Sequence, residues 1–386
     1  METWSAHQLF QASSEKLGDD TAAAVQRYAG NLRSNGLPVI FTLGHLGKIT
    51  GIDYDLLHAS VNRRRESSNY TMFSVRKRSG GRRFIHAVNG KLHDLHQYLN
   101  EEILQKIEPH PSSFAFHPSG GIRQCAAMHC GCKWLLQFDL KDFFYSVAEP
   151  AVYRVFCGLG YKSLLAFELA RLCTTVRLPD SKSHHVRLTD AFPFDGIDEP
   201  TMPYHPRACI GVLPQGAPTS PMLSNLVARK LDRMLFNFAL ENGFVYTRYA
   251  DDLAFSASRL PSGKSVTQLR REIISHIRKG GFRENKKKIR IAGPGAKRTV
   301  LGLLVDGQKP KLTKELRKRI DRNLYSIEEH DLRPAADHYG FDSPFGFFNH
   351  VSGLMSFIHD ADPDEWHKLN PRFEAIKQKL SDTDFS

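Results

Sequence analysis

Hydrophobic and polar positions follow two different periods along this chain, and together they predict a mixture of helices and strands. Apolar residues recur at every third or fourth position, as on one face of a helix, in residues 1–35, 43–49, 54–64, 90–107, 150–175, 219–242 and 263–280. They alternate, or form short apolar runs, in residues 71–88, 134–138, 245–256, 286–291, 300–305 and 309–312. From residue 313 onward the period is helical again, apart from a loop expected at 334–344. This order predicts an α+β fold with a helical C-terminal end.

Length and composition narrow the class of protein. The 386 residues, of which 41% are hydrophobic, are enough for two or three packed units. No apolar run reaches the roughly 18 residues that would predict a transmembrane helix. Residues 1–5 lack the basic-then-apolar pattern of a signal peptide, so we expect a cytoplasmic protein without membrane contact. Cys130 and Cys132 lie close together, but they lack the paired spacing of a zinc site, and we expect ordinary thiols.

The net charge of +12 indicates a polyanionic partner, of which nucleic acid is the commonest. Residues 311–322 carry cations that recur three or four positions apart, which would form a stripe able to follow a duplex backbone. These residues are Lys311, Lys314, Arg317, Lys318, Arg319 and Arg322. Residues 63–65 are three arginines at the end of a predicted helix. They could contact template phosphate or simply complement the helix C-terminus.

Carboxylates follow two of the apolar strands. Asp139 comes directly after residues 134–138, and Asp251 and Asp252 lie at the tip of the hairpin predicted at 245–256. Adjacent acids inside a hairpin repel each other, and a divalent cation would remove that cost. Two magnesium ions can activate an attacking hydroxyl and hold a leaving pyrophosphate. The pattern therefore favours phosphoryl transfer, with an ordinary aspartate turn as the alternative.

At these carboxylates the sequence resembles a known family. Residues 249–252, Tyr-Ala-Asp-Asp, resemble the YxDD signature of reverse transcriptases. Residues 138–144, Phe-Asp-Leu-Lys-Asp-Phe-Phe, resemble the first palm motif of the retron and group II intron branch. Residues 211–221, Gly-Val-Leu-Pro-Gln-Gly-Ala-Pro-Thr-Ser-Pro, resemble the second motif of that branch. The chain thus resembles bacterial reverse transcriptases of the retron and group II intron-like branch.

The resemblance implies a right-hand polymerase with fingers, a palm built on an antiparallel sheet, and a helical thumb. We expect an N-terminal helical region at 1–70, fingers at 71–130, palm at 131–305 and thumb at 306–386. Within the palm, the polar residues 176–208 would form an insertion or extended hairpin. Residues around 211–225 would be the fingers-like part.

The resemblance also implies a role for individual residues. Catalysis would use Asp139, Asp251, Asp252 and Lys288, and two Mg²⁺ ions, replaceable by Mn²⁺, would be held by Asp139, the Leu140 position, Asp251 and Asp252. Lys288 could donate a proton to pyrophosphate or simply contact phosphate. Phe144 would be a steric gate against ribonucleotides, unless it only packs in the core. Contacts to the incoming deoxynucleotide would come from Lys77, Arg83, Leu140, Asp142, Phe143, Phe144, Gln215 and Gly216. Contacts to nucleic acid would come from Tyr249, Gly302, Lys314, Arg317 and Lys318.

The expected activity is RNA-directed DNA synthesis. Residues 36–46 resemble bacterial reverse transcriptases of phage defence, which implies antiviral defence with a cognate non-coding RNA as template or partner, and a homo-oligomer or an effector as a further partner. A retron enzyme that makes a branched RNA–DNA hybrid is an alternative. Two departures bear on it: Cys125 stands where the retron Asn-Ala-x-x-His motif has Asn, and Leu301 replaces Thr in Val-Thr-Gly. Template-independent or protein-primed synthesis, and a non-catalytic RNA-binding scaffold, are further alternatives.

Overall fold

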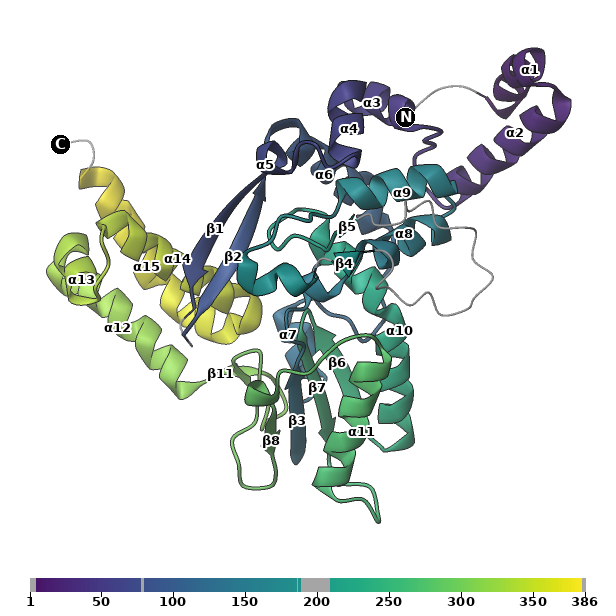
Figure 1. The fold of residues 1–386 in the computed structure, drawn as a ribbon. Helices are drawn as coiled ribbons and strands as arrows, with labels where there is room; N and C mark the ends of the chain where they lie inside the picture. The colour runs from purple at the N-terminus through teal and green to yellow at the C-terminus, as the bar shows by residue number, and fades with distance from the viewer. Residues whose placement is uncertain (1–4, 78–79, 186, 189–208, 384–386) are drawn as a thin grey trace. The chain divides into compact units, whose positions relative to one another are not determined.

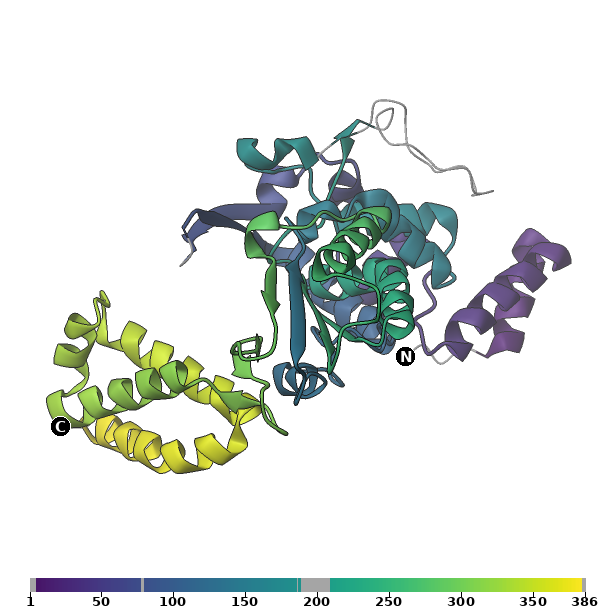
Figure 2. The same cartoon turned by 90° about the horizontal axis from the view of Figure 1, so that it is seen from below.

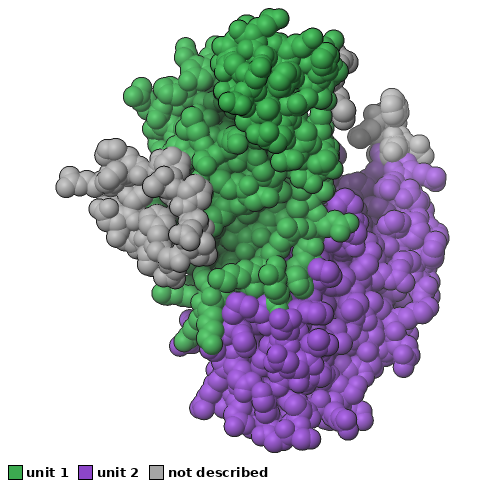
Figure 3. Space-filling view, turned by 90° about the vertical axis from the view of Figure 1, so that its right-hand side faces the viewer, with its two compact units in different colours: residues 1–110, 140–233, 278–283 green, residues 111–139, 234–277, 284–386 purple. Residues whose placement is uncertain are grey.

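A computed structural model describes residues 5–77, 80–185, 187–188 and 209–383 (Figures 1 and 2). The chain divides into two compact units, coloured separately in Figure 3. Unit 1 consists of residues 1–110, 140–233 and 278–283, and unit 2 consists of residues 111–139, 234–277 and 284–386. Each unit is therefore assembled from separate stretches of chain.

Unit 1 begins with helices where the sequence predicts them, with one difference. The single helix expected over 1–35 is two helices, α1 (Ala6–Leu17) and α2 (Asp19–Ser34). Gly18 separates them with a positive φ of 82°, a conformation that glycine adopts without steric cost. Three shorter helices follow, α3 (Leu43–Thr50), α4 (Tyr54–Val61) and α5 (Glu66–Asn69).

A long hairpin follows in unit 1. Strands β1 (Tyr70–Arg76) and β2 (Arg82–Val88) pair antiparallel from Tyr70 opposite Val88 to Arg76 opposite Arg82. The expected hairpin is confirmed, and helix α6 (Gly90–Glu102) comes after it. The helix expected at 150–175 is divided into α8 (Glu149–Gly158) and α9 (Ser163–Leu172).

A buried ion-pair cluster joins these parts of unit 1. Glu149 is fully buried, and its Oε2 lies 2.6 Å from Arg63 Nη2. The same oxygen accepts a hydrogen bond of 2.9 Å from the Gly211 amide, and Arg171 lies 3.5 Å from the other oxygen. Arg63 thus points into the protein, where burial opposes its charge but Glu149 and Glu66 raise its pKa above the ordinary arginine value. One carboxylate therefore ties the start of the 211–221 motif to α8 and α9.

Unit 2 is built on an antiparallel sheet of four strands in the order β6-β7-β3-β8. The strands are β3 (Trp134–Asp139), β6 (Val245–Tyr249), β7 (Asp252–Ala257) and β8 (Arg290–Ala292). On one face, Phe255 packs with Phe138, Phe238, Phe244 and Tyr246. The predicted strand over 286–291 is wrong in its first half, because Lys286–Lys288 form a 3₁₀ turn before β8 begins.

Two long helices, α10 (Ser220–Glu241) and α11 (Val266–Lys279), each contribute residues to both units. The C-terminal end is helical, as expected from the sequence (Figure 2), and it belongs to unit 2. A small sheet of β9 (Thr299–Val300), β10 (Leu303–Leu304) and β11 (Lys311–Leu312) leads into it. Its four helices are α12 (Lys314–His330), α13 (Leu332–His338), α14 (Pro344–Ala361) and α15 (Pro363–Thr383). The loop expected at 334–344 is partly wrong, because α13 includes Pro334 in its first turn, where proline is tolerated. The mixture of helices and strands and the antiparallel sheet are as predicted.

Candidate active site

The acids at the hairpin tip and at the end of β3 lie on directly paired strands of unit 2. Strand β6 ends at Tyr249, which pairs with Asp252 at the start of β7, so that Ala250 and Asp251 form a two-residue turn. Asp252 also pairs with Asp139 on β3. Directly opposite residues point to the same face of a sheet with their Cβ atoms roughly 5 Å apart. The register therefore brings Asp139 and Asp252 together, with Asp251 next to them in the turn.

Asp139 is held by two residues that follow it far along the chain. It is only 3% exposed, and its Oδ1 accepts a hydrogen bond of 2.9 Å from the Asn285 side chain. The Asn285 amide donates a second bond, of 2.7 Å, to the carbonyl of Asp139. The ammonium of Lys288 forms an ion pair with Oδ2, while 56% of the lysine side chain remains exposed. Lys288, predicted as catalytic, thus lies at the carboxylates, whereas Asn285 was not singled out from the sequence.

The carboxylates repel one another strongly enough to change their titration. The pKa of Asp252 is raised to about 6, because surrounding protein removes part of its solvent and because Asp251 and Asp139 repel its charge. Lys288 and Arg290 act in the opposite direction. By surface area the Asp252 side chain is nevertheless exposed, so a cation can reach it. For Lys288, burial lowers the pKa, but the bond to Asp139 and the three carboxylates raise it overall.

These residues fit a divalent cation through their charge. Oxygen ligands are those that Mg²⁺ prefers, and a divalent charge would remove the repulsion that raises the Asp252 pKa. Across the described part of the chain, no three or more His, Cys, Asp and Glu side chains are already arranged as a metal centre. Asn285 and Lys288 occupy the two carboxylate oxygens of Asp139 that a cation would need.

Unit 1 contains the residues expected to contact the nucleotide. Leu140 and Phe143 are buried, with Phe143 packed 5.6 Å from both the Phe144 and Phe282 rings. Contacts from Leu140 and Phe143 would therefore have to use their main-chain groups. Phe144 is only partly buried.

Asp142 belongs to a second charged cluster in unit 1. Its side chain lies 2.6 Å and 2.7 Å from Lys182 Nζ and 3.5 Å from His185 Nε2. Both partners come from a 3₁₀ helix, Asp180–His185, in the predicted insertion, whose residues 186 and 189–208 lie outside the described chain. His185 and Lys182 hold the pKa of Asp142 far below its usual range, although burial acts the other way. The positive φ of 51° at Asp142 sets this residue in a turn.

Gln215 and Gly216 pack against the hairpin in unit 1. The Gln215 carbonyl accepts a hydrogen bond of 2.8 Å from the His86 amide on β2. A Cβ on Gly216 would lie 2.9 Å from Ile85 Cγ2, and its φ of 119° also favours glycine. Ile85 and Arg83 share a face of β2 because they are two residues apart. Arg83 and Lys77 are exposed, and the hairpin turn beyond Lys77 includes residues 78–79, which lie outside the described chain.

The residues expected to contact nucleic acid lie elsewhere in unit 2. Leu301 and Gly302 form the turn between β9 and β10, both with positive φ, and Tyr249 is half-buried beside Asp252. On α12, the side chains of Lys314, Arg317 and Lys318 are exposed. Their spacing of three and four residues places them on one side of the helix, as the predicted stripe requires.

A buried histidine joins β6 and β7, the two strands of the hairpin whose turn carries Asp251. His129 is 1% exposed, and its ring nitrogens lie 2.7 Å from Thr247 Oγ1 on β6 and 2.7 Å from Ser256 Oγ on β7. Cys125, from helix α7 (Ile122–Ala127), donates a bond of 3.3 Å to the same threonine oxygen. Burial lowers the pKa of His129 to about 4, so the ring is neutral at physiological pH. Cys125, which departs from the retron motif, and His129, which fits it, are therefore both interior supports of the hairpin.

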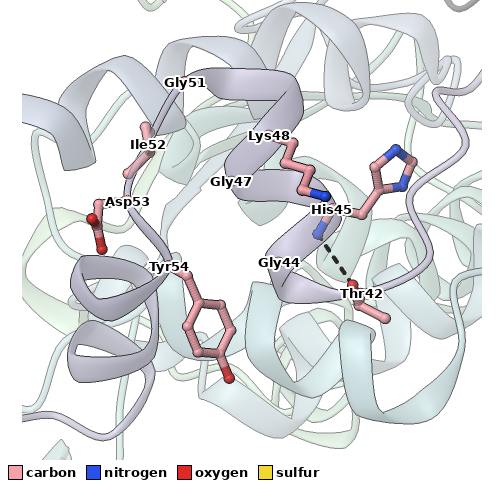
Figure 4. A pocket seen from close by; sticks show the side chains of 9 residues that line it. All are labelled: Thr42, Gly44, His45, Gly47, Lys48, Gly51, Ile52, Asp53 and Tyr54. Atoms are coloured by element: carbon pink, nitrogen blue, oxygen red, sulfur yellow. Dashed lines mark hydrogen bonds between the residues drawn. The ribbon is translucent and has the colours of Figure 1, made fainter.

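A separate hollow of about 830 Å³ lies in unit 1 between α3 and the start of α4 (Figure 4). Its lining includes His45 and Lys48 from α3 and the half-exposed Tyr54. It contains none of the residues predicted for catalysis, nucleotide binding or nucleic-acid contact. No helix in the described ranges is long and apolar enough to span a membrane.

Three carboxylates and a lysine at one end of an antiparallel sheet form the kind of site that transfers nucleotides with divalent cations. Comparison with known proteins agrees. Residues 75–305 match the reverse transcriptase (RNA-dependent DNA polymerase) family. The chain is 32% identical over 374 residues to the retron Mx65 reverse transcriptase of Myxococcus xanthus, covering 96% of this chain and 80% of that protein. It is 29% identical over 350 residues to the retron Ec86 reverse transcriptase of Escherichia coli, covering 90% and 93%.

Solved structures of related function are more distant. Telomerase from Candida albicans, in complex with a fragment of telomeric RNA, is 12% identical with a TM-score of 0.38, over 84% of this chain and 61% of that chain. A foamy viral protease–reverse transcriptase in complex with double-stranded DNA is 15% identical with a TM-score of 0.37, over 80% and 39%. Both scores are low, so the assignment comes from the sequence comparisons.

The chain belongs to the reverse transcriptase family. It is a reverse transcriptase of the bacterial retron type, and its activity is RNA-directed DNA polymerisation. The predicted family, fold class and activity are confirmed, and the two departures at Cys125 and Leu301 do not remove the chain from the retron group. Reverse transcriptases use divalent metal ions and act on nucleic acid, and in this respect the expected cofactor and partner classes are confirmed.

Proposed function

We propose that Asp139, Asp251 and Asp252 hold two Mg²⁺ ions, with Mn²⁺ as a substitute, and that Leu140 contributes through its main-chain carbonyl. The observation that carries this proposal is the register, which sets Asp139 opposite Asp252 beside the Asp251 turn. When bound, the ions would lower the pKa of the primer 3′-hydroxyl and neutralise charge on the triphosphate. Ionised carboxylates are required, so protonation of Asp252, whose pKa is about 6 without a cation, would compete with cation binding in mildly acidic solution.

Lys288 would act in two stages. Without a cation, its ammonium neutralises the buried Asp139. A cation at the carboxylates would replace that charge, which frees the exposed Lys288 side chain to contact phosphate or to give a proton to pyrophosphate. A lysine side chain is protonated at neutral pH because its ordinary pKa is about 10.4, so Lys288 could act as an acid in this step.

In unit 1 we propose that Lys77 and Arg83 bind the triphosphate and that Gln215 and Gly216 lie against the base pair. Asp142 and the main chain of Leu140 and Phe143 would line the nucleotide site. Phe144 would exclude a 2′-hydroxyl. On nucleic acid, Tyr249 and Gly302 would support the primer end, and Lys314, Arg317 and Lys318 would follow the duplex backbone. The division into an N-terminal region, fingers, palm and thumb at 1–70, 71–130, 131–305 and 306–386 belongs to this proposal.

The central test adds template RNA, a primer, Mg²⁺ and labelled deoxynucleotides to the purified protein. The double variant Asp251→Ala, Asp252→Ala should make no DNA, whereas Asp342→Asn, an exposed acid before α14, should match wild type. Full synthesis by the double variant would overturn the proposed site. Sequencing the product separates templated from template-independent or protein-primed synthesis.

The steric gate has its own test. Phe144→Ala should incorporate ribonucleotides more readily, measured as the ratio of kcat/KM for a deoxynucleotide to that for the matching ribonucleotide. Phe345→Ala removes another ring, one that is 70% exposed on α14, and serves as the control. Unchanged discrimination in Phe144→Ala would show that this ring only packs in the protein.

We further propose a cytoplasmic role in anti-phage defence with a cognate non-coding RNA as template or partner. The similarity to retron reverse transcriptases supports this, and it also favours the synthesis of a branched RNA–DNA hybrid as the second candidate. RNA that copurifies with the protein should be one structured species, and phage plating efficiency should rise when the Asp251 and Asp252 double variant replaces wild type. An effector protein or a second copy of the chain is the further partner we expect in that setting.

A further inference from the structure

Arg248, the residue before the Tyr-Ala-Asp-Asp turn, has an unusual environment in unit 2. It is 0% exposed and is the largest by volume of the described side chains that are less than 2% exposed. On strand β6 it points to the face of the sheet that carries Tyr246, because residues two apart share a face. That face is the aromatic one around Phe255. An apolar side chain would fill this space at less cost than a guanidinium, so the choice of arginine needs a reason.

The guanidinium bonds to the turn and to Ser113, whose segment is bridged to Arg248 on β6. Nη1 donates a hydrogen bond of 3.2 Å to the carbonyl of Ala250, and Nη2 donates one of 3.1 Å to Ser113 Oγ. The main chain reinforces this link: the Arg248 amide donates to the Ser112 carbonyl at 2.7 Å, and the Phe114 amide donates to the Arg248 carbonyl at 2.8 Å. The main chain of Arg248 is therefore held in place by Ser112 and Phe114, and its side chain extends from this fixed point to the turn.

The turn itself needs support. Ala250 is the first residue of the two-residue turn and has a φ of 55°, which is the left-handed region. Glycine is favoured at that place in hairpin turns, because a Cβ makes the conformation unfavourable. A donor aimed at the Ala250 carbonyl fixes the peptide plane between Ala250 and Asp251. The orientation of that plane determines the direction in which the Asp251 side chain leaves the main chain.

We propose that Arg248 is a positioning residue for catalysis, which holds the strained Ala250 turn so that Asp251 and Asp252 keep the geometry that binds cations. This inference rests on the proposed role of these carboxylates as metal ligands. Because Arg248 is 0% exposed, it would act through the turn and not by touching substrate. Ser113 anchors the other end of the guanidinium and makes the arrangement rigid.

A double-mutant cycle tests it, with Arg248→Met, Ala250→Gly and their combination. Loss of the arginine should lower kcat for primer extension by roughly 100-fold, the size of effect expected when a catalytic group is misplaced by about 1 Å. KM for the primer–template should stay the same. Glycine adopts the turn without strain. The combined variant should therefore have a kcat at least tenfold higher than that of Arg248→Met alone. The rise in Tm on adding Mg²⁺, measured without substrate, should be lost in Arg248→Met and return in the combined variant.

The matched control is Arg372→Met, which removes a different arginine of unit 2, one that is ion-paired with Glu328 and Asp321. Arg372→Met should lower Tm, and adding Ala250→Gly should not reverse this effect. Additive losses in the cycle, or a normal Mg²⁺ shift in Arg248→Met, would overturn the proposal. If Arg248→Met does not fold, the same cycle with Arg248→Lys applies, because one ammonium cannot reproduce the two-armed contact; full activity of Arg248→Lys would likewise overturn it. If the Asp251 and Asp252 double variant is active, the proposed metal site itself is refuted. If that double variant is inactive but the losses from Arg248→Met and Ala250→Gly are additive, only the positioning role of Arg248 is refuted.

Discussion

Protonation of His129 should lower the free energy of unfolding in mildly acidic solution, and the size of this loss follows from the burial of the histidine ring. An exposed histidine has a pKa of 6.5, whereas that of His129 is about 4. Below pH 6.5 the unfolded chain therefore binds a proton that the folded protein excludes. The contribution of His129 to the free energy of unfolding is fully present above pH 6.5 and is lost as the pH falls toward 4. At about 1.4 kcal/mol per pKa unit, the complete loss is about 3 kcal/mol, and about 2 kcal/mol of it occurs between pH 7.5 and pH 5.0.

The variant His129→Gln separates this linkage from the loss of a contact. It leaves one of Thr247 and Ser256 without its buried partner, which should cost about 2 kcal/mol at pH 7.5. Glutamine does not titrate, so the difference from wild type should shrink to nearly zero at pH 5.0. Urea unfolding followed by tryptophan fluorescence reports mainly on unit 2, because Trp134 and Trp366 lie there.

Other histidines require a control. His330→Gln changes an exposed residue on α12 and should leave the stability at both pH values unchanged. His96, which burial also gives a pKa of about 4, belongs to unit 1 and remains in both proteins, so its contribution cancels in the comparison. A difference between wild type and His129→Gln that is the same at pH 7.5 and 5.0 would refute the reasoning.

Three further predictions follow from individual contacts. Glu149→Gln leaves the buried Arg63 guanidinium without its main counter-charge and should lower the free energy of unfolding by about 3 kcal/mol, measured by urea denaturation. Gly216→Ala should raise KM for the deoxynucleotide and cost about 1–3 kcal/mol of stability, because the added Cβ meets β2 at 2.9 Å; an unchanged KM would contradict the proposed place of this residue. Lys288→Met removes a charge that lowers the Asp252 pKa, so the acidic limb of the profile of kcat/KM against pH should move to higher pH; a limb that does not move would show that Asp252 does not control it.

Much of the fold could be predicted because its elements are locally encoded. The alternation in residues 71–88 and 245–256 predicted both hairpins, and the acids after residues 134–138 predicted where β3 ends. Errors occurred where one residue decides the local structure. Gly18 divides a periodic segment, and Pro334 is compatible with the first turn of a helix as well as with a loop.

The partners of the site residues could not be predicted in the same way. Lys288 pairs with Asp139 across 149 residues, and Lys182 pairs with Asp142 across 40. No local period relates such positions, and a charged residue in a sequence is compatible with many partners. Arg248 shows the same limit, because only its burial and its bond to Ala250 distinguish it from a surface arginine before the motif.

The way the chain passes between the two compact units has a consequence for its synthesis. It crosses from one unit to the other five times, at 110/111, 139/140, 233/234, 277/278 and 283/284, and one crossing follows directly after Asp139. On the ribosome, unit 1 lacks its last segment until Arg283 has been made, and unit 2 lacks all of its C-terminal helices until still later. Contacts between distant segments form slowly, so the nascent chain keeps unpaired strands exposed for much of translation. A polymerase of this design should therefore depend on chaperones during synthesis, and cutting the gene at 139/140, 233/234 or 277/278 would leave two fragments that each lack part of both units.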